Sequence, residues 1–441
     1  MRSITNLARD LRAGKATSAS LVEQALERIA SSPFAFLKVN AQGARGAAAE
    51  SDRRLASSQG RSLLEGIPVS IKDLFDVEGE VTTAGSVALR SHAVASRDAP
   101  VVARLREAGA VVIGRTHMSE YAFTGLGDNP HFPKCQNPHD AFRVCGGSSS
   151  GAAASVGFDQ VALGLGTDTG GSVRIPASFC GLVGFKPTQS RVSREGAFVL
   201  SPTQDSIGPI ARTVMCCVIA DGVIAGSGSL SAGASSLAGL RLAVPRDYVL
   251  DGLEPAVASR FEKTLSVLSG KGVIVEPIGF PHFQEVPALF ARGTIVNAEA
   301  FSHHSKLGLL EQRDLYDPSV LARIDIGGRM TADDLVRLFD ERKRLIDLTQ
   351  QISRHYDALV MPTTPIRAPR FDEIAEPAAF GRLNGLALRN TSLFNFLDRC
   401  AISLPMPGEG ELPTGLMLVG EHLGDAKLLS VALAVEAGLA G

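Results

Sequence analysis

The segment GGSSSGAAASVGFDQVALGLGTDTGGSVRIP, residues 146–176, decides the fold more than any other part of the chain. It opens with a run of glycine and serine over 146–151 and ends with a second run over 164–176. Between the turns, residues 151–156 predict the start of a helix and residues 161–166 predict a buried strand. A helix and a strand bounded by glycine turns indicate α/β architecture.

The same alternation of short apolar runs and amphipathic segments extends in both directions. Strands are predicted over residues 69–72, 110–114, 240–244, 273–276, 358–361, 401–404 and 416–419. Helices are predicted over residues 20–30, where Ser20 and Glu23 fit a capping box, and over 98–107, 256–269, 332–354 and 426–439.

A low-complexity connector interrupts this pattern at residues 225–239, which are almost entirely Gly, Ser, Ala and Leu. Such a segment fits a domain boundary and a surface loop equally well. We expect a single domain over residues 1–441, with the connector on its surface.

Composition excludes several classes of protein. The 441 residues are 45% hydrophobic and 20% charged, and the net charge of -2 favours neither nucleic acid nor a membrane surface as a partner. No apolar run approaches the roughly 18 residues of a membrane span, and the N-terminus lacks a secretory core, so we expect a cytoplasmic protein. The six cysteines contain no C-x-x-C pair of the kind found in zinc or redox sites, which predicts free thiols. The sequence also contains no metal-ligand cluster and no cofactor fingerprint, so we expect neither a metal nor a cofactor.

Three familiar glycine motifs fail to match the segment. No G-x-x-x-x-G-K-[ST] run exists for a phosphate-binding loop, and Gly164-x-Gly166 lacks the third glycine of a dinucleotide fingerprint. Ser172 lies in GGSVR rather than in the G-x-S-x-G of a hydrolase elbow. Alone, either glycine and serine run would be a loop in most proteins.

A lysine upstream of the two glycine and serine runs suggests a catalytic role for their serines. Residues 66–73, GIPVSIKD, place Lys72 at the end of an apolar segment that reads as a strand. A serine on a glycine turn, a second serine and a buried lysine are the parts of an acyl-transfer site without histidine. Without the paired runs, Lys72 beside Asp73 would be read as a surface residue.

Together these residues resemble the amidase signature family, whose serine hydrolases use a Ser-cisSer-Lys triad. Residues 146–176 match the family's signature at nearly every specified position, and the spacing of Ser148 and Ser172 is the family's spacing. Further blocks at residues 184–188, 205–209, 362–365 and 401–405 extend the resemblance over essentially the whole chain. It implies an α/β fold of the amidase signature type, with a large mixed β-sheet flanked by helices on both faces.

The resemblance implies a role for each member of the triad. Ser172 would be the nucleophile that forms an acyl-enzyme, and Ser148, preceded by a cis peptide bond, would bridge it to Lys72. Lys72 must be neutral to act as a base, and burial at a strand end would lower its pKa.

The remaining motif residues would support this triad. Backbone N–H groups of Thr169, Gly170, Gly171 and Ser172 would form the oxyanion hole, whereas Ser149, Asp168 and Arg174 would hold the loop. The chain departs from the family pattern at Cys145, where the family usually has proline, and at His117, which could lie near the substrate channel.

The resemblance implies that the chain is an amidase. Such an enzyme would hydrolyse the C–N bond of a small-molecule amide to a carboxylate and ammonia or an amine. One alternative is the glutaminase subunit of a tRNA-dependent amidotransferase, which would need partner subunits. A second is a hydrolase of a urea-like or carboxylated nitrogen compound, and a third is a catalytically silent protein. The block QDSIGP at residues 204–209 and the chain's modest length favour the stand-alone enzyme.

Substrate contacts are expected from three side chains. Tyr121 and Phe123 lie in the EYAF segment at residues 120–123, and Arg323 could anchor an acidic substrate. No metal or cofactor is required by a serine and lysine mechanism, and homodimers in the family make a homodimer possible here.

Overall fold

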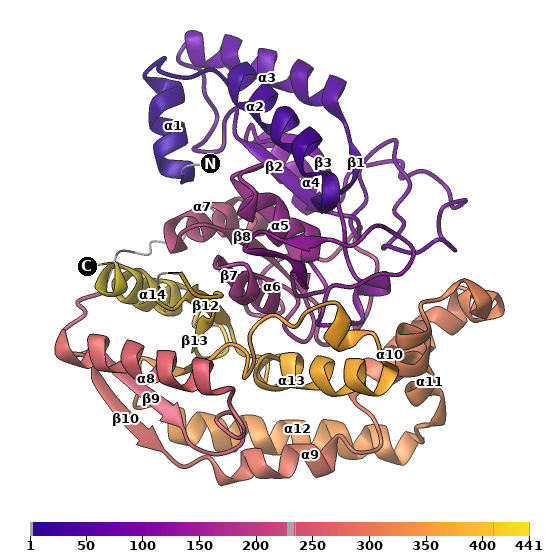
Figure 1. Ribbon diagram of the computed structural model, residues 1–441, viewed down its shortest axis with the longest axis vertical. Helices are drawn as coiled ribbons and strands as arrows, with labels where there is room; N and C mark the ends of the chain where they lie inside the picture. The colour runs from indigo at the N-terminus through magenta and orange to yellow at the C-terminus, as the bar shows by residue number, and fades with distance from the viewer. Residues whose placement is uncertain (1–2, 227–232, 234, 409, 441) are drawn as a thin grey trace.

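The computed structural model describes residues 3–226, 233, 235–408 and 410–440, and these build a mixed sheet of eleven strands. The strands lie in the order β1 (Phe36–Val39), β3 (Val111–Thr116), β2 (Pro68–Lys72), β6 (Leu163–Asp168), β8 (Ser206–Ala211), β7 (Val183–Lys186), β12 (Ala401–Pro405), β13 (Gly415–Val419), β11 (Ala358–Pro362), β9 (Arg241–Pro245) and β10 (Ile274–Ile278). Figure 1 shows this sheet running the length of the molecule, from β1 to β3 at the top to β9 and β10 at the bottom. A separate hairpin pairs β4 (Gln136–Asn137) with β5 (Asp140–Val144).

The sheet is mixed in direction. β2 pairs in parallel with both β3 and β6, and β9 pairs in parallel with both β10 and β11. The strands between these two parallel groups pair antiparallel. β2 and β6 are therefore adjacent parallel strands, and both end at the same edge of the sheet, which brings Lys72 close to Asp168.

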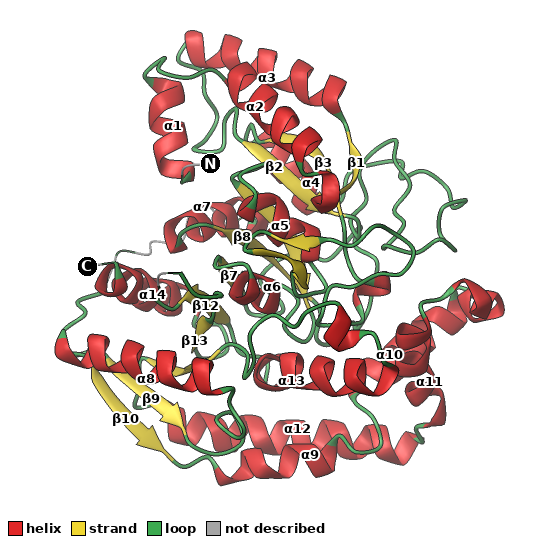
Figure 2. Ribbon diagram, viewed as in Figure 1, coloured by secondary structure: helices red, strands yellow, loops and turns green. Residues whose placement is uncertain are grey.

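Helices cover both faces of the sheet, as the resemblance implied (Figure 2). One face packs against α1 (Ile4–Arg12), α4 (Pro100–Glu107), α7 (Val214–Ala225), α8 (Pro255–Gly270) and α14 (Asp425–Leu439). The other face packs against α2 (Ser18–Ser31), α3 (Ala41–Ala56), α5 (Ser150–Gly157), α6 (Arg174–Phe179), α12 (Ala332–Ser353) and α13 (Pro377–Phe396). Of the remaining helices, α9 (Val286–Leu289) packs in the same core as α12 and α13. α10 (Ile295–Lys306) and α11 (Pro318–Arg329) lie beside the sheet and pack against residues 121–123.

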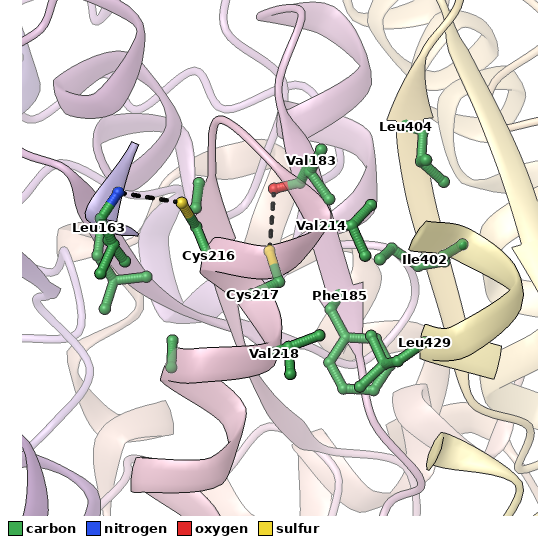
Figure 3. Close-up of a cluster of buried hydrophobic side chains, with 14 of the residues drawn as sticks. Leu163, Val183, Phe185, Val214, Cys216, Cys217, Val218, Ile402, Leu404 and Leu429 are labelled. Carbon is green, nitrogen blue, oxygen red and sulfur yellow. Dashed lines mark hydrogen bonds between the residues drawn. The ribbon is translucent and has the colours of Figure 1, made fainter. Parts of the chain in front are cut away.

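The alternation of strand residues explains this division. In β11, Val360 joins the core under α7 and α14, while Leu359 and Met361 join the core under α12 and α13. Figure 3 shows the first core, where Phe185 of β7 and Ile402 of β12 lie close to the side chains of α7 and α14. Each fully buried side chain of this size stabilises the fold by about 1.5–3 kcal/mol.

Every strand predicted from sequence is confirmed, with ends that differ by one or two residues. The first turn of α2 was predicted wrongly, because the helix begins at Ser18 and its cap is Thr17. The Thr17 hydroxyl accepts from the backbone N–H of Ser20, and the Ser20 hydroxyl closes a reciprocal capping box. Glu23 instead pairs with Arg45 of α3.

Of the connector predicted over residues 225–239, residues 227–232 and 234 lie outside the described residues. The chain enters it from the C-terminus of α7, where Gly226 adopts a left-handed conformation. In the part of the chain that the structure describes, no helix is both long and apolar enough to cross a membrane.

Gly164 of β6 allows α5 to pack directly against the sheet. A Cβ atom at this position would lie 2.6 Å from the backbone oxygen of Ala152, a separation that requires the helix to move. The glycines that weakly suggested a dinucleotide fingerprint therefore serve the packing of the helix that follows the first serine run.

We expect Gly164→Ala to lower the free energy of unfolding by about 1–3 kcal/mol, because the added methyl overpacks the contact between α5 and β6. Gly46→Ala is the matched control: Gly46 is exposed on α3, its Cβ would meet nothing within 4 Å, and it should raise stability by about 0.5–1 kcal/mol. Urea denaturation of both variants measures the difference. Changes of the same sign would contradict this account of the interface.

Candidate active site

Lys72 is the last residue of β2 and is completely buried. Its Nζ donates to the Oγ of Ser148 at 2.8 Å and to the Oγ1 of Thr167 at 2.7 Å. Burial lowers the pKa of Lys72 to about 7, although the negative charges of Asp205 and Asp168 oppose this shift. A substantial fraction of the lysine is therefore a neutral amine near neutral pH.

Ser148 lies on the turn that joins β5 to α5, and the peptide bond between Gly147 and Ser148 is cis. The next residue, Ser149, also holds this turn in place. The hydroxyl of Ser149 donates to the carbonyl of Thr167 at 3.3 Å, and the backbone N–H of Ser149 donates to the carbonyl of Ser172 at 3.3 Å. The first serine run therefore contacts the backbone of the second.

The second serine run is fixed by a fully buried ion pair between Asp168 and Arg174. Arg174 donates through Nη2 and Nε to the two carboxylate oxygens at 2.9 and 3.0 Å, and the backbone N–H groups of Val173 and Arg174 also donate to Asp168. Burial alone would raise the pKa of Asp168, but the charge of Arg174 prevails and lowers it to about 2. The clamp spans the loop that contains Gly170, Gly171 and Ser172.

α13 holds the same loop from the other side. Asn395 donates to Asp168 Oδ1 at 2.9 Å and accepts from Arg174 at 2.6 Å, while the Thr391 hydroxyl donates to the Gly170 carbonyl at 2.6 Å. Gly171 has a φ of +135°, and a Cβ there would lie 2.1 Å from the Thr391 hydroxyl. The sequence predicted neither α13 nor these contacts of Asn395 and Thr391.

A cavity of about 220 Å³ opens over this loop. Thr169, Gly170 and Ser172 form part of its lining. The rest of the wall is mainly apolar and includes a few polar side chains. Its residues are Ala122, Phe123, Thr124, Leu200, Gln204, Tyr248, Phe290, Thr294, Val296, Arg323, Gly385, Leu388, Arg389, Ser392 and Phe396. An apolar pocket with a few convergent polar groups fits a small organic molecule.

Two of the three expected substrate contacts line this cavity. The guanidinium carbon of Arg323 lies 4.7 Å from the centre of the Phe123 ring, and burial lowers the pKa of Arg323 only to about 10, so it stays charged. Among the described residues no carboxylate forms an ion pair with Arg323, and its Nε lacks a hydrogen-bond partner. The cavity thus contains a cation available to an anionic group.

Tyr121 does not line the cavity, contrary to expectation. The side chain is completely buried behind the wall, where its ring packs against His304 at 4.5 Å and Tyr316 at 5.2 Å between ring centres. The backbone explains this placement, because Tyr121 and Ala122 both have positive φ values and turn the chain between Tyr121 and Phe123. His117 is also buried away from the cavity and contacts the Ser150 hydroxyl at 2.9 Å.

Sequence reasoning missed Thr167 and Asp205. Thr167 is the second partner of Lys72, but a threonine within a strand carries no distinguishing signal. Asp205 accepts from the Thr169 hydroxyl at 2.6 Å and from the backbone N–H groups of Leu200 and Ser201. Its position within the 205–209 block was the available clue.

Thiols and metal ligands play no visible part in this arrangement. Cys145 is buried, burial raises the pKa of its thiol well above the usual range, and the thiol contacts the carbonyl of Gln136. The residues that the structure describes contain no cluster of three or more side chains suited to hold a metal ion.

We expect Arg174→Met to destabilise the fold by about 3–5 kcal/mol, because it leaves Asp168 buried without its counter-charge. Arg97→Met, which breaks the exposed pair with Glu195, is the matched control and should cost less than about 1 kcal/mol. Thermal and urea unfolding measure both. Equal losses would show that the buried pair does not hold the loop.

Comparison with known proteins agrees with this geometry. A family model described as Amidase matches residues 20–429. The chain is 34% identical to 2-amino-5-chloromuconic acid deaminase from Comamonas testosteroni, over 89% of the chain and 86% of that protein. It is 36% identical to a glutamyl-tRNA(Gln) amidotransferase subunit from Anaeromyxobacter sp. (strain K), over 96% and 94% respectively.

A solved amidase structure has a TM-score of 0.90 to this one at 32% identity, and the match covers 99% of this chain and 100% of the other. The family match extends over most of the chain, and the two relatives align with it nearly end to end. The chain therefore belongs to the amidase signature family and is an amide-hydrolysing enzyme.

Proposed function

We propose that this chain is a stand-alone amidase that cleaves a small-molecule amide through an acyl-enzyme on Ser172. The observation that carries the proposal is the 2.8 Å contact of the buried Lys72 amine with Ser148, next to the loop whose Ser172 lines the cavity. A buried amine with a pKa of about 7 suits a general base at neutral pH.

Acylation begins when Ser172 Oγ attacks the amide carbonyl. The Ser172 proton passes to Ser148 Oγ while the Ser148 proton passes to the neutral Nζ of Lys72, which becomes an ammonium. The tetrahedral intermediate collapses as Lys72 returns a proton through Ser148 to the leaving nitrogen. The C–N bond breaks, and ammonia or an amine leaves an ester on Ser172.

Deacylation uses water by the same route. Water loses a proton to Lys72 through Ser148 and attacks the ester carbonyl, and Ser172 recovers its proton as the carboxylate product leaves. In both steps the oxyanion would be stabilised by backbone N–H groups of Thr169, Gly170, Gly171 and Ser172. Each such donor is worth about 3–4 kcal/mol in a transition state, and the clamp of Asp168 and Arg174 fixes their direction.

The cavity supports an amide that also carries a carboxylate. Arg323 faces this space as a charged group without a carboxylate partner among the described residues, and a substrate carboxylate would supply one. Apolar side chains such as Phe290 and Phe396 would cover the carbon skeleton. A carboxylated nitrogen compound fits the same description, so that alternative differs only in the group that carries the scissile bond.

The glutaminase subunit is the second candidate. Arg323 could hold the carboxylate of glutamine, and the chain covers 94% of the length of one amidotransferase subunit, so chain length does not separate the two functions as expected from sequence. The decisive difference is the need for partner subunits. A stand-alone amidase hydrolyses its substrate as the isolated chain.

We expect the purified chain to release ammonia from small amides, with acid amides preferred over neutral ones of equal length. Ser172→Ala should abolish release, Lys72→Ala should remove most of it, and Ser148→Ala should fall between them or near Lys72→Ala. An enzymatic ammonia assay over glutamine, ω-amide acids, aryl amides and urea derivatives measures this. Full activity of Ser172→Ala would contradict the mechanism. If the parent chain released ammonia from none of the amides, the result would favour the glutaminase subunit.

The pH profile tests the role of Lys72. Since only the neutral amine accepts a proton, kcat/KM should fall about tenfold per pH unit below a pKa of about 7 and level off above it. Thr167→Val removes an acceptor that stabilises the ammonium, so the acid limb should move to lower pH. An acid limb that stays unmoved in Thr167→Val would argue that another group titrates.

A further inference from the structure

The loop formed by residues 119–125 contacts both the turn that contains Ser148 and the helix α11, which carries Arg323. Residues 119–125 contact the turn at both of their ends: the Ser119 N–H donates to the Ser148 carbonyl at 3.1 Å, and the Gly147 N–H donates to the Gly125 carbonyl at 2.8 Å. Between these contacts the loop contributes Ala122, Phe123 and Thr124 to the cavity wall. Any shift of the loop would therefore change the cavity and the turn together.

Glu120 attaches this loop to α11. Its Oε2 accepts from the backbone N–H of Asp317 at 2.7 Å, and Asp317 caps the N-terminus of α11. Arg323 lies on the same helix, over the ring of Phe123, which belongs to the loop. Glu120 is thus a hydrogen-bonded link between the helix that carries Arg323 and the loop that contacts the serine turn.

We propose that Glu120 is a positioning residue that sets where Arg323 stands relative to Ser172 and thereby determines the preference for amides that carry a carboxylate. The inference rests on the proposed function, in which Arg323 binds that carboxylate. Glu120 itself does not line the cavity, so it acts through α11 rather than on the substrate.

Burial and backbone conformation both support this role. Glu120 is completely buried, and a carboxyl group is rarely placed there unless its position is specified by hydrogen bonds. The next two residues, Tyr121 and Ala122, have φ values of 48° and 60°, a conformation that non-glycine residues adopt only where the surroundings enforce it. Packing of Tyr121 against Tyr316, the neighbour of Asp317, supplies a second contact between the loop and the segment that leads into α11.

The Glu120 side chain acts mainly as a hydrogen-bond acceptor. Burial raises its pKa to about 7, against the opposing hydrogen bond from Asp317, and its Oε1 lies 3.2 Å from Nε2 of His131. An uncharged amide of the same shape can accept from the Asp317 N–H equally well. Glu120→Gln should therefore preserve the link, whereas Glu120→Ala removes it.

The test uses the purified full-length chain and matched pairs of amides, which are succinamate with butyramide and glutaramate with valeramide. The measured quantity is the ratio of kcat/KM for the acid amide to kcat/KM for its neutral partner. Glu120→Ala should lower this ratio by about tenfold or more, chiefly through KM of the acid amide. Glu120→Gln should stay within about threefold of the parent, and Glu311→Ala, an exposed carboxylate before α11, should leave the ratio unchanged.

A double-mutant cycle separates positioning from general damage. If Glu120 acts through Arg323, then Glu120→Ala should lower the ratio no further in a chain that already carries Arg323→Met. Equal loss on acid and neutral amides, or additive losses in the cycle, would overturn the positioning role. If Arg323→Met alone leaves the ratio unchanged, the carboxylate anchor itself fails. If Arg323→Met abolishes the preference for acid amides while Glu120→Ala leaves that preference unchanged, only the inference about Glu120 fails.

Discussion

The buried ion pair of Asp168 and Arg174 is the interaction on which the rest of the site depends. Two charges with no exposure to water are stable only when each is fully hydrogen-bonded, and here the backbone of the loop and Asn395 of α13 complete the set. The clamp joins the end of β6, the loop that contains Ser172 and α13. It holds the glycine-rich segment in one conformation, in which the proposed mechanism would use the backbone N–H groups of residues 169–172.

A second constraint follows from the same edge of the sheet. β2 and β6 run in parallel, so Lys72 and Thr167 meet where both strands end, and burial there weakens the ammonium form of the lysine. Asp205 and Asp168 act in the opposite direction and keep the pKa near neutrality rather than far below it. In the proposed mechanism, this balance of burial against two carboxylates would let Lys72 take the place that histidine has in other serine hydrolases.

Sequence reasoning succeeded where the information was local. The strand that ends at Lys72 and the strand and helix around the serine runs follow from short apolar patterns and glycine turns. It failed for contacts that depend on distant segments, because Thr391 and Asn395 become meaningful only when α13 crosses the loop. Tyr121 illustrates the limit: an aromatic residue beside Phe123 was expected in the same pocket, but two positive φ values turn it into the core. Glu120 carries no sequence signal for its contact with α11.

The most direct test of the account is covalent labelling of the folded chain with a serine-reactive fluorophosphonate, mapped by peptide mass spectrometry. The account predicts a single adduct on Ser172, which forms much more slowly in Lys72→Ala although that variant remains folded by circular dichroism. A folded chain that does not label, or that labels at another serine with equal speed in both proteins, would contradict the assignment of Ser172 and Lys72.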